Sequence, residues 1–395
     1  MKSLHTAFSF APPSILSLTI YLDNAATTYP KPEEVYQKID WANRNIAINA
    51  GRGSYKAAQE ASRLIEETRR QLIELVHGLG NEHAVLLPSA TIALNVILNG
   101  LSFSDGDVIY VSPYEHNAVS RTLYRISTIK NIHIEELPVK DNLEIDMDKV
   151  KYLFMKNKPS CVCCTHVSNV TGYILPVEEI FEIAKEYGAV TIMDASQSFG
   201  LLDIDIKKIK ADYIAFAGHK TLYGPLGAAG FIDNARLSLD TFIVGGTGSD
   251  SLNLDMPRQV PERYEAASKN IVAIVGLHEA LTVIDRNGNY QKEKLLSEYA
   301  VDKLKKLKNI ILYIPENLTQ HIGVISFNVK GYKADDVGMI LDEDFDIAVR
   351  TGYHCAPYIH KYLDDEKYLG TVRISLGQYN KKNDIDQLID AISEL

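Results

Sequence analysis

The chain has 395 residues, of which 46% are hydrophobic and 23% charged, and it carries a formal net charge of −10 with an isoelectric point near 5.6. This length suits two domains, and the acidic charge argues against a nucleic-acid-binding protein, whose phosphate contacts need clustered lysine and arginine. No apolar run approaches the roughly 20 residues that span a bilayer, and four cysteines without paired spacing indicate a reducing compartment, so we expect a cytoplasmic protein without membrane contact.

Residues 1–20 are predicted to form an N-terminal extension, because their basic region is thin and their apolar run is interrupted. From residue 21 onward, short apolar strands alternate with helices. The predicted strands lie near residues 21–22, 85–87, 108–111, 161–164, 190–193 and 213–217, and the helices follow residues 32, 60, 90, 118 and 175. This alternation predicts an α/β fold with a mostly parallel sheet, in which ligands bind at the carboxyl ends of the strands.

Beyond residue 277 the pattern changes to a long charged helix at 291–307, followed by an alternating strand at 324–329. A helix from residue 334, a strand at 347–349 and a last helix around 385–392 complete a smaller α+β domain. The sequence therefore predicts a large domain at 21–277 and a small domain at 278–395. Within the large domain, residues 21–30 are a candidate to pack against the small domain.

Two predicted strand ends carry the charged groups that a pyridine cofactor requires. Asp194 follows the strand 190–193, and Lys220 follows the strand 213–217 after Gly218 and His219. A lone lysine at a strand end is usually solvated. A carboxylate that keeps a ring nitrogen protonated, together with a lysine that binds an aldehyde as a Schiff base, is the pair that pyridoxal 5'-phosphate needs. The two residues predict this cofactor.

Other residues near strand ends fit the same cofactor, although each also has an ordinary reading. Ala90 and Thr91 follow Ser89 at the start of a helix, where free backbone amides bind phosphate or a side chain caps the helix. His116 is either a solvated loop histidine or a ring that stacks on the cofactor and relays protons. Asn169 either shapes a turn before Gly172 or donates a hydrogen bond to the phenolic oxygen of the cofactor.

The C-terminal part supplies a thiol and a cation. Cys355 follows Arg350 and His354 in a predicted loop, so its thiol is either an incidental exposed group or a partly ionised nucleophile. Arg373 lies in an apolar strand, where partial burial requires an anion such as a substrate carboxylate. No metal site is expected. Cysteines 161, 163 and 164 and His166 lie on one predicted strand, whose alternate residues face opposite ways and cannot converge on an ion.

Taken together, these motifs resemble the cysteine desulfurase family, class V of the fold-type I pyridoxal phosphate enzymes, and within it the SufS-like branch more than the NifS-like one. The matching motifs span nearly the whole chain from Tyr21. They are 21–28, the loop 51–53, 115–116, 166–172, 194–197, 218–220, 350–357 and 373–375.

The resemblance implies a large domain with a seven-stranded sheet, a homodimer, and a reaction that converts L-cysteine to L-alanine and leaves a persulfide on Cys355 for a sulfur-acceptor protein, in iron–sulfur cluster or thio-cofactor assembly. It implies a Schiff base and Cα proton transfer for Lys220, a pyridinium contact for Asp194 and ring stacking for His116. The remaining implied roles are phenolic-oxygen contacts for Asn169 and Gln197, phosphate contacts for Ala90, Thr91 and His219, and substrate contacts for Arg373, Arg350 and Asn24.

The chain departs from the family in two short segments. Ala217 stands where relatives usually carry serine or threonine, which removes one phosphate hydrogen bond and weakens cofactor binding by about 1 kcal/mol. Ala267 and Ser268 replace a glycine–threonine pair; Ser268 keeps a hydroxyl that can reach the phosphate bound by the other subunit, whereas Ala267 restricts the backbone if that position needs a positive φ. Selenocysteine lyase, another class-V aminotransferase or lyase, and a degenerate pyridoxal-binding protein are the alternative functions.

Overall fold

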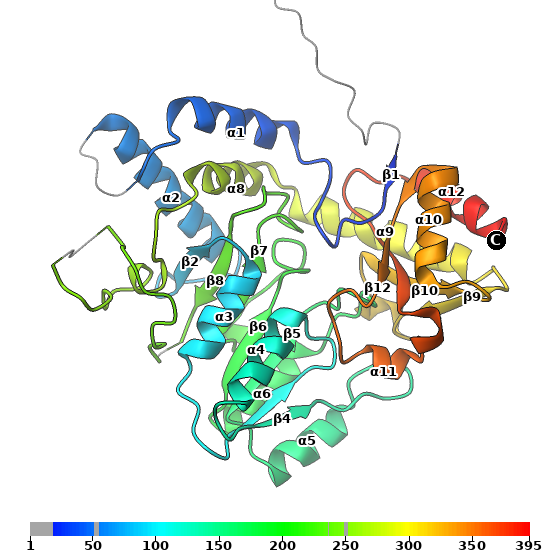
Figure 1. Ribbon diagram of the computed structural model, residues 1–395, viewed down its shortest axis with the longest axis horizontal. Coiled ribbons are helices and arrows are strands. Elements are labelled where there is room, and N and C mark those ends of the chain that lie inside the picture. The colour runs from blue at the N-terminus through cyan, green and yellow to red at the C-terminus, as the bar shows by residue number, and fades with distance from the viewer. Residues whose placement is uncertain (1–18, 51–54, 236, 249–251) are drawn as a thin grey trace, which may run out of the picture.

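The computed structural model describes residues 19–50, 55–235, 237–248 and 252–395 (Figure 1). Most of the predicted extension 1–20 and the whole loop 51–53 lie outside the described residues. The longer helices are α1 (Glu33–Asn45), α2 (Lys56–Glu74), α3 (Ala90–Gly100), α4 (Asn117–Ser127), α5 (Met147–Lys156), α6 (Val177–Glu186), α8 (Ile271–Val283), α9 (Arg286–Leu304), α10 (Ala334–Phe345) and α12 (Lys382–Ser393). Two single-turn helices are α7 (Ile206–Ile209) and α11 (His360–Leu363).

Seven strands form the large sheet, in the order β2-β8-β7-β6-β5-β3-β4. They are β2 (His83–Leu87), β3 (Val108–Val111), β4 (His133–Glu136), β5 (Cys161–Thr165), β6 (Val190–Asp194), β7 (Tyr213–Ala217) and β8 (Ala229–Asp233). The strands β7, β6, β5, β3 and β4 are parallel, whereas β8 is antiparallel to both of its neighbours. The predicted mostly parallel α/β sheet is confirmed, and its carboxyl edge is the edge that carries Asp194 and Lys220.

Local signals explain where the helices around this sheet begin and end. The side chain of Ser89 accepts a hydrogen bond from the amide of Ile92, at 3.2 Å, and so caps the first turn of α3. α6 has two glutamates in its first turn and a lysine in its last, which complement the helix dipole. It ends just before Gly188, whose φ of 75° is readily adopted by glycine.

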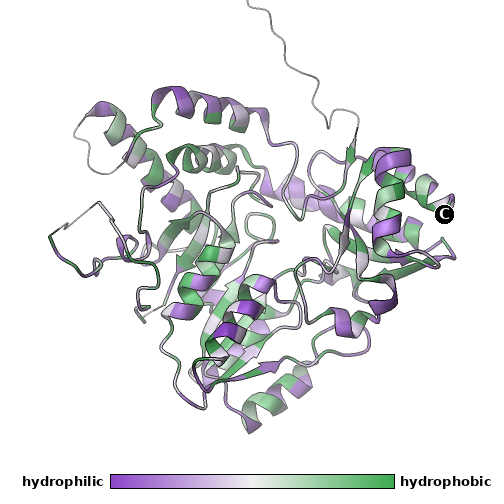
Figure 2. Ribbon diagram, in the orientation of Figure 1, coloured by the Kyte–Doolittle hydropathy of each residue, from purple (hydrophilic) through white to green (hydrophobic). Residues whose placement is uncertain are grey.

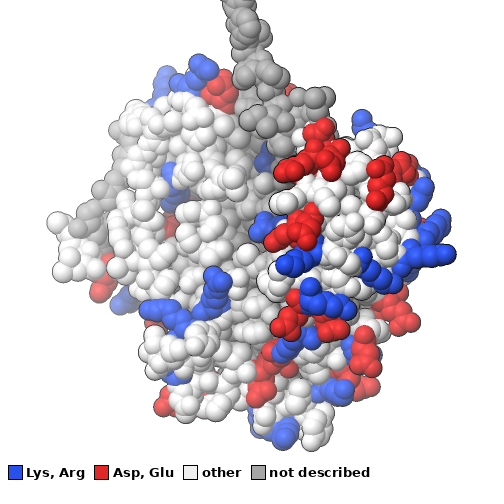
Figure 3. Space-filling view, turned by 45° about the vertical axis from the view of Figure 1, so that its right-hand side comes forward, with Lys and Arg blue, Asp and Glu red and all other residues white. Residues whose placement is uncertain are grey.

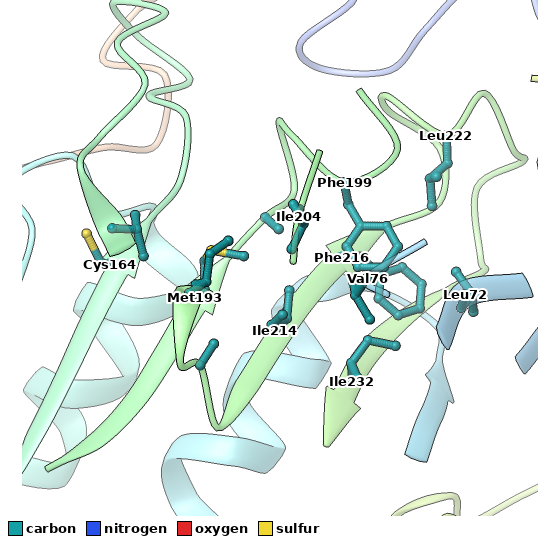
Figure 4. Packing of buried hydrophobic residues seen from close by; sticks show 14 of the residues in the cluster. Leu72, Val76, Cys164, Met193, Phe199, Ile204, Ile214, Phe216, Leu222 and Ile232 are labelled. Carbon is teal, nitrogen blue, oxygen red and sulfur yellow. The ribbon is translucent and has the colours of Figure 1, made fainter. Parts of the chain in front are cut away.

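Apolar side chains cover both faces of the large sheet. Figure 4 shows part of one face, with Cys164, Met193, Ile214, Phe216 and Ile232 on successive strands and Phe199, Leu222, Leu72 and Val76 packed over them. Cys161 and Cys163, whose sulfur atoms lie 4.0 Å apart, belong to the core on the opposite face. These three cysteines of β5 are core residues, and the described part of the chain contains no group of three metal-ligating side chains.

The small domain is built on an antiparallel four-stranded sheet in the order β12-β13-β10-β9. Its strands are β9 (Ile310–Tyr313), β10 (Val324–Val329), β12 (Arg350–Gly352) and β13 (Thr371–Ser375). A separate parallel pair joins β1 (Ile20–Tyr21) to β11 (Ile347–Ala348), and Leu22 lies in the small-domain core. α8 runs through the predicted boundary between residues 277 and 278, so the exact division at that point stays a prediction.

Hydropathy and charge follow this arrangement. In Figure 2 the central strands are coloured hydrophobic, whereas the outward side of α10 is hydrophilic. The face in Figure 3 carries acidic and basic side chains next to one another over the small domain. Among the described residues, no helix is both long enough and apolar enough to span a membrane.

Candidate active site

A cavity of about 230 Å³ is lined both by residues at the carboxyl ends of the large-sheet strands and by residues of the small domain. Residues from the α3 start and from the ends of β5, β6 and β7 line one side, and residues of β12, β13 and the cysteine loop line the other. The lining includes Ala90, Thr91, His116, Asn169, Asp194, Gln197, Ala217, His219, Lys220, Arg350, His354, Cys355 and Arg373. Eleven site residues expected from the sequence therefore meet in one cavity.

Asp194 and Lys220 form the charged centre of this cavity. Asp194 ends β6 and is 6% exposed, and its Oδ1 atom accepts a hydrogen bond from the amide of Ser196 at 2.9 Å. Burial lowers the pKa of Lys220 from 10.5 to about 8, although the Asp194 carboxylate opposes this shift. The amine therefore has a substantial neutral fraction near physiological pH, as required for attack on an aldehyde carbon.

The start of α3 and His219 provide an anion site at one end of the cavity. Ala90 and Thr91 are in the first turn of α3, where backbone amides lack intrahelical partners and the helix dipole attracts negative charge. The buried Nδ1 atom of His219 has no hydrogen-bond partner within the described residues, and burial lowers the pKa of this imidazole to about 4. A neutral histidine with a free nitrogen beside a helix N-terminus fits a phosphate group as a hydrogen-bond donor.

His116 has a defined tautomer. It is the N-cap of α4, and its Nδ1 atom accepts a hydrogen bond from the amide of Ala118 at 3.0 Å. The ring proton is therefore on Nε2, and burial lowers the pKa of the imidazole, which favours this neutral form. Glu115, the residue before it, is buried, which raises the pKa of its carboxyl to about 8, and one carboxyl oxygen accepts from Ser112 and from the Thr165 amide.

Two amide side chains of the cavity are also used to hold backbone. The Asn169 side chain donates to the carbonyl oxygen of His354 at 2.7 Å, and Gln197 donates to that of Ala25 at 2.8 Å. Each amide nitrogen has a second hydrogen that these contacts do not use. Both residues are therefore held in place while keeping one donor for a ligand oxygen.

Two arginines face the cavity from adjacent strands. Arg373 and Arg350 are cross-strand partners on β13 and β12. Arg373 donates to the carbonyl oxygen of Asn169 at 2.9 Å and forms an ion pair with Asp23 at 2.7 Å, while its buried Nε atom has no partner within the described residues. No sequence pattern indicated that Asp23 is the anion beside Arg373. Two guanidinium groups side by side favour binding of a carboxylate.

Cys355 is exposed and lies on the wall shared by this cavity and an outer groove of about 500 Å³. The carbonyl oxygen of Cys355 accepts a hydrogen bond from the amide of Asn117 at 2.7 Å, which joins the loop to the large domain. The thiol is therefore accessible from the Lys220 side and from the outside. The groove is lined by residues that include Asn117, Arg121, Tyr353 and Pro357.

Two of the predicted site residues do not line this cavity. Asn24 uses its amide nitrogen for contacts with the Ser375 carbonyl and Asn380, and its oxygen accepts from the Tyr29 amide, so these groups are engaged within the chain and its substrate contact stays a prediction. Ser268 lies in a separate cavity beside Ala267, which has a φ of 81°. Position 267 therefore does need a positive φ, and its alanine restricts the backbone there, as the sequence comparison with the family predicted.

Sequence reasoning missed a second group of residues that hold the cysteine loop, including His360 and Asp365. Both lie in a polar stretch without hydrophobic periodicity, so no pattern identified them. The short spacing of a histidine and an aspartate around a predicted loop was the only available signal.

The comparisons with known proteins agree with this geometry. The family described as Aminotransferase class-V matches residues 20–388. The chain therefore belongs to the class-V aminotransferase family.

Its relatives within that family are cysteine desulfurases, and the predicted resemblance is confirmed. The chain is 33% identical to a probable cysteine desulfurase of Pyrococcus abyssi, with 95% of this chain and 94% of the relative covered. It is 31% identical to a cysteine desulfurase of Haloferax volcanii, with coverages of 94% and 88%. The structure of the apo cysteine desulfurase from Thermococcus onnurineus NA1 superimposes with a TM-score of 0.87 at 32% identity, covering 95% of this chain and 94% of that one.

Proposed function

We propose that the protein is a pyridoxal 5'-phosphate-dependent cysteine desulfurase. The observation that carries the proposal is that Lys220, Asp194, Arg373 and Cys355 line one cavity, although they come from both domains. A degenerate pyridoxal-binding protein would not need the arginine and the thiol in that cavity. The desulfurase relatives over nearly the full chain support the same activity.

The residues of the cavity fit the cofactor at each of its polar groups. Asp194 is suited to the ring nitrogen, Asn169 and Gln197 to the phenolic oxygen, and His219 with the start of α3 to the phosphate. When bound, pyridoxal phosphate withdraws electrons from the α-carbon of an attached amino acid. Ala217 supplies no hydroxyl to the phosphate, so His219 and the helix amides carry this contact.

Within this site each residue has a separate task. Arg373 and Arg350 orient the carboxylate of L-cysteine, and Lys220, whose pKa near 8 suits proton exchange, moves the proton at the α-carbon. His116 presents an Nε2–H group to the same space. The Cys355 thiolate attacks the substrate sulfur: the substrate C–S bond breaks, an S–S bond forms, and the β-carbon takes up the electron pair and a proton. The products are L-alanine and a Cys355 persulfide.

The position of Cys355 also supports a sulfur-acceptor protein. The outer groove gives a second approach to the thiol, on the side away from Lys220, so an acceptor nucleophile can reach the persulfide without entering the cavity. Arg121 and Arg350 in that groove suit an acidic acceptor surface. The four free cysteines fit a reducing compartment, and we infer the cytoplasm.

A homodimer belongs to the same proposal. Ser268 lines a cavity that does not include Lys220, so its hydroxyl has a role at a cofactor only if the other subunit brings one to it. Among the described residues between 242 and 254, five large apolar side chains are exposed in the single chain, and burial against a second copy would remove them from water. They are Phe242, Ile243, Val244, Leu252 and Leu254.

A single-turnover reaction of the holoenzyme with L-cysteine tests the function. We expect one L-alanine per site and a mass increase of one sulfur atom on the peptide that contains Cys355. The three buried cysteines of β5 are internal controls in the same digest and should stay unmodified. Cys355→Ser should keep the cofactor absorption and form no persulfide. Unchanged sulfide release by this variant would contradict the proposal.

A further inference from the structure

A histidine–aspartate pair lies directly behind the cysteine loop. His360, the first residue of α11, and Asp365 are 8% and 1% exposed. Nδ1 of His360 lies 2.6 Å from Oδ2 of Asp365, and Nε2 of the same ring lies 3.0 Å from the carbonyl oxygen of Tyr353. The pair thus connects a buried carboxylate to the backbone two residues before Cys355.

The two contacts of His360 define the protonation of the pair. The carbonyl oxygen of Tyr353 can only accept, so Nε2 donates to it. An ionised Asp365 can also only accept, so a hydrogen must lie between it and Nδ1, on the ring or on the carboxyl group. The pair is therefore either an imidazolium beside a carboxylate or a neutral imidazole beside a carboxylic acid. Its net charge is zero in both cases, which avoids an unpaired buried charge.

The backbone that the pair contacts is strained. His354 and Cys355 have φ values of 46° and 58°, in the left-handed region that costs roughly 1–2 kcal/mol for a residue with a side chain. Such geometry persists only where surrounding contacts determine it. Each of the three carbonyl oxygens of the loop is held: that of Tyr353 by His360 and the Ala356 amide, that of His354 by Asn169, and that of Cys355 by the Asn117 amide.

These anchors come from both domains. Asn117 and Asn169 belong to the large domain, whereas His360 holds the Tyr353 carbonyl from the small-domain side and Thr371 contacts the His354 ring from the same side. The rings of His360 and Tyr353 also pack in a T-shaped arrangement, with centroids 5.0 Å apart and planes at 89°. Without the imidazole, the Tyr353 carbonyl loses its only side-chain donor among the described residues.

We propose that His360 and Asp365 are positioning residues of the desulfurase reaction. The imidazole, hydrogen-bonded to Asp365, donates to the Tyr353 carbonyl and thereby holds the Cys355 thiol at the cavity that contains Lys220. This inference rests on the proposed function. Neither residue lines the cavity of Lys220, so their effect is expected on sulfur transfer and not on cofactor binding.

The test compares two variants of the holoenzyme in single turnover. His360→Phe combined with Asp365→Leu removes both hydrogen bonds but leaves no buried charge, which preserves folding. We expect persulfide formation on Cys355 to fall by about 10- to 100-fold, because small displacements of a nucleophile have effects of this size. Asp365→Asn should stay within about threefold of the wild type, since its amide can donate to Nδ1 of a neutral His360.

Two further measurements separate positioning from a general structural role. The visible absorption of the bound cofactor, and its change on addition of L-cysteine, should be the same in all variants. His77→Gln is the matched control, because His77 and Asp203 form an exposed pair at 2.7 Å far along the chain from the loop, and it should behave as the wild type. Persulfide formation at the wild-type rate in the double variant would overturn the inference.

If the double variant does not fold, His360→Gln and Asp365→Ala provide the same comparison. Glutamine keeps a donor for the Tyr353 carbonyl and should lose less than about threefold, whereas alanine leaves His360 without its partner and should lose about tenfold. Equal rates for these two variants would also overturn the inference. A wild-type holoenzyme that forms no persulfide would instead contradict the proposed function and, with it, this role of the pair.

Discussion

The two walls of the active-site cavity are built in different ways. On the large-domain wall, Asp194 ends one buried parallel strand and Lys220 follows the next, and regular hydrogen bonding of the sheet sets their positions. On the small-domain wall, Cys355 lies in a loop with two left-handed residues, which long-range hydrogen bonds hold. The cofactor wall is therefore rigid by architecture, whereas the thiol wall depends on a few individual contacts.

This difference predicts that substitutions in the two walls affect different parts of the reaction. Damage to the large-domain wall should remove cofactor chemistry altogether, because Lys220 is required for every later step. Damage to the cysteine loop should leave the cofactor bound and reactive, and affect sulfur transfer alone.

The largest expected effect is that of Lys220→Ala. We expect loss of the visible absorption of bound cofactor and a decrease in turnover of about 10⁴-fold or more, because Lys220 is the only lysine among the described residues that line the cavity. Absorption spectra and alanine release check both outcomes. Lys185→Ala, which removes a lysine that pairs with Asp212 in the outer layer, is the control and should keep both signals. Normal alanine release by Lys220→Ala would contradict the assignment of this wall.

Arg373→Gln tests the contact between the two walls. Arg373 donates a hydrogen bond to the Asn169 carbonyl of the large domain and forms an ion pair with Asp23. We expect kcat/KM for L-cysteine to fall about 100-fold, mainly through a higher KM, since the charge-assisted contact to the carboxylate is lost. Steady-state kinetics give the split between kcat and KM. Arg44→Gln, at an exposed pair with Asp40, is the control. An unchanged KM would assign carboxylate binding to Arg350 instead.

The large-domain wall could be predicted from the sequence better than the cysteine loop. Apolar runs that end in Asp194 and near Lys220 predicted the strands and their functional ends, because one local pattern determines both. The position of Asn24 depends on a contact with the distant Ser375, which no local pattern encodes. His360 and Asp365 are close in sequence, but their spacing alone does not show that the imidazole reaches the Tyr353 carbonyl. The antiparallel direction of β8 was not predicted either, since strand direction is set by the neighbouring strands and not by a strand's own residues.

The pH dependence of unfolding tests how much the burial of Lys220 destabilises the protein without cofactor. The folded-state pKa of Lys220, about 8, lies below the value near 10.5 in the unfolded chain, because burial disfavours the ammonium form. Between these values the unfolded state binds more protons, so the stability contribution of this lysine is present above the unfolded pKa and is lost as the pH falls through about 8.

Lys220→Met removes this titration. At pH 7 the apo variant should be more stable than the wild-type apoprotein by about 3 kcal/mol, and roughly half of this difference should remain at pH 9.5. Urea unfolding at both pH values measures the two differences. Any pH-independent effect of the methionine cancels between them, so a difference that does not change with pH would contradict the buried-amine assignment.

The smallest expected effect concerns the segment of Ser268, which belongs to neither wall of the same subunit. Ala267 has a φ of 81°, and its amide donates to the carbonyl oxygen of Gly246 at 2.8 Å. Glycine adopts this conformation without strain but has a more flexible unfolded state, so Ala267→Gly should stabilise the protein by about 0.5–1 kcal/mol. Thermal unfolding measures the effect, with Ala266→Gly as the neighbouring control, which should not stabilise. Destabilisation by Ala267→Gly would mean that the backbone at this position is not strained.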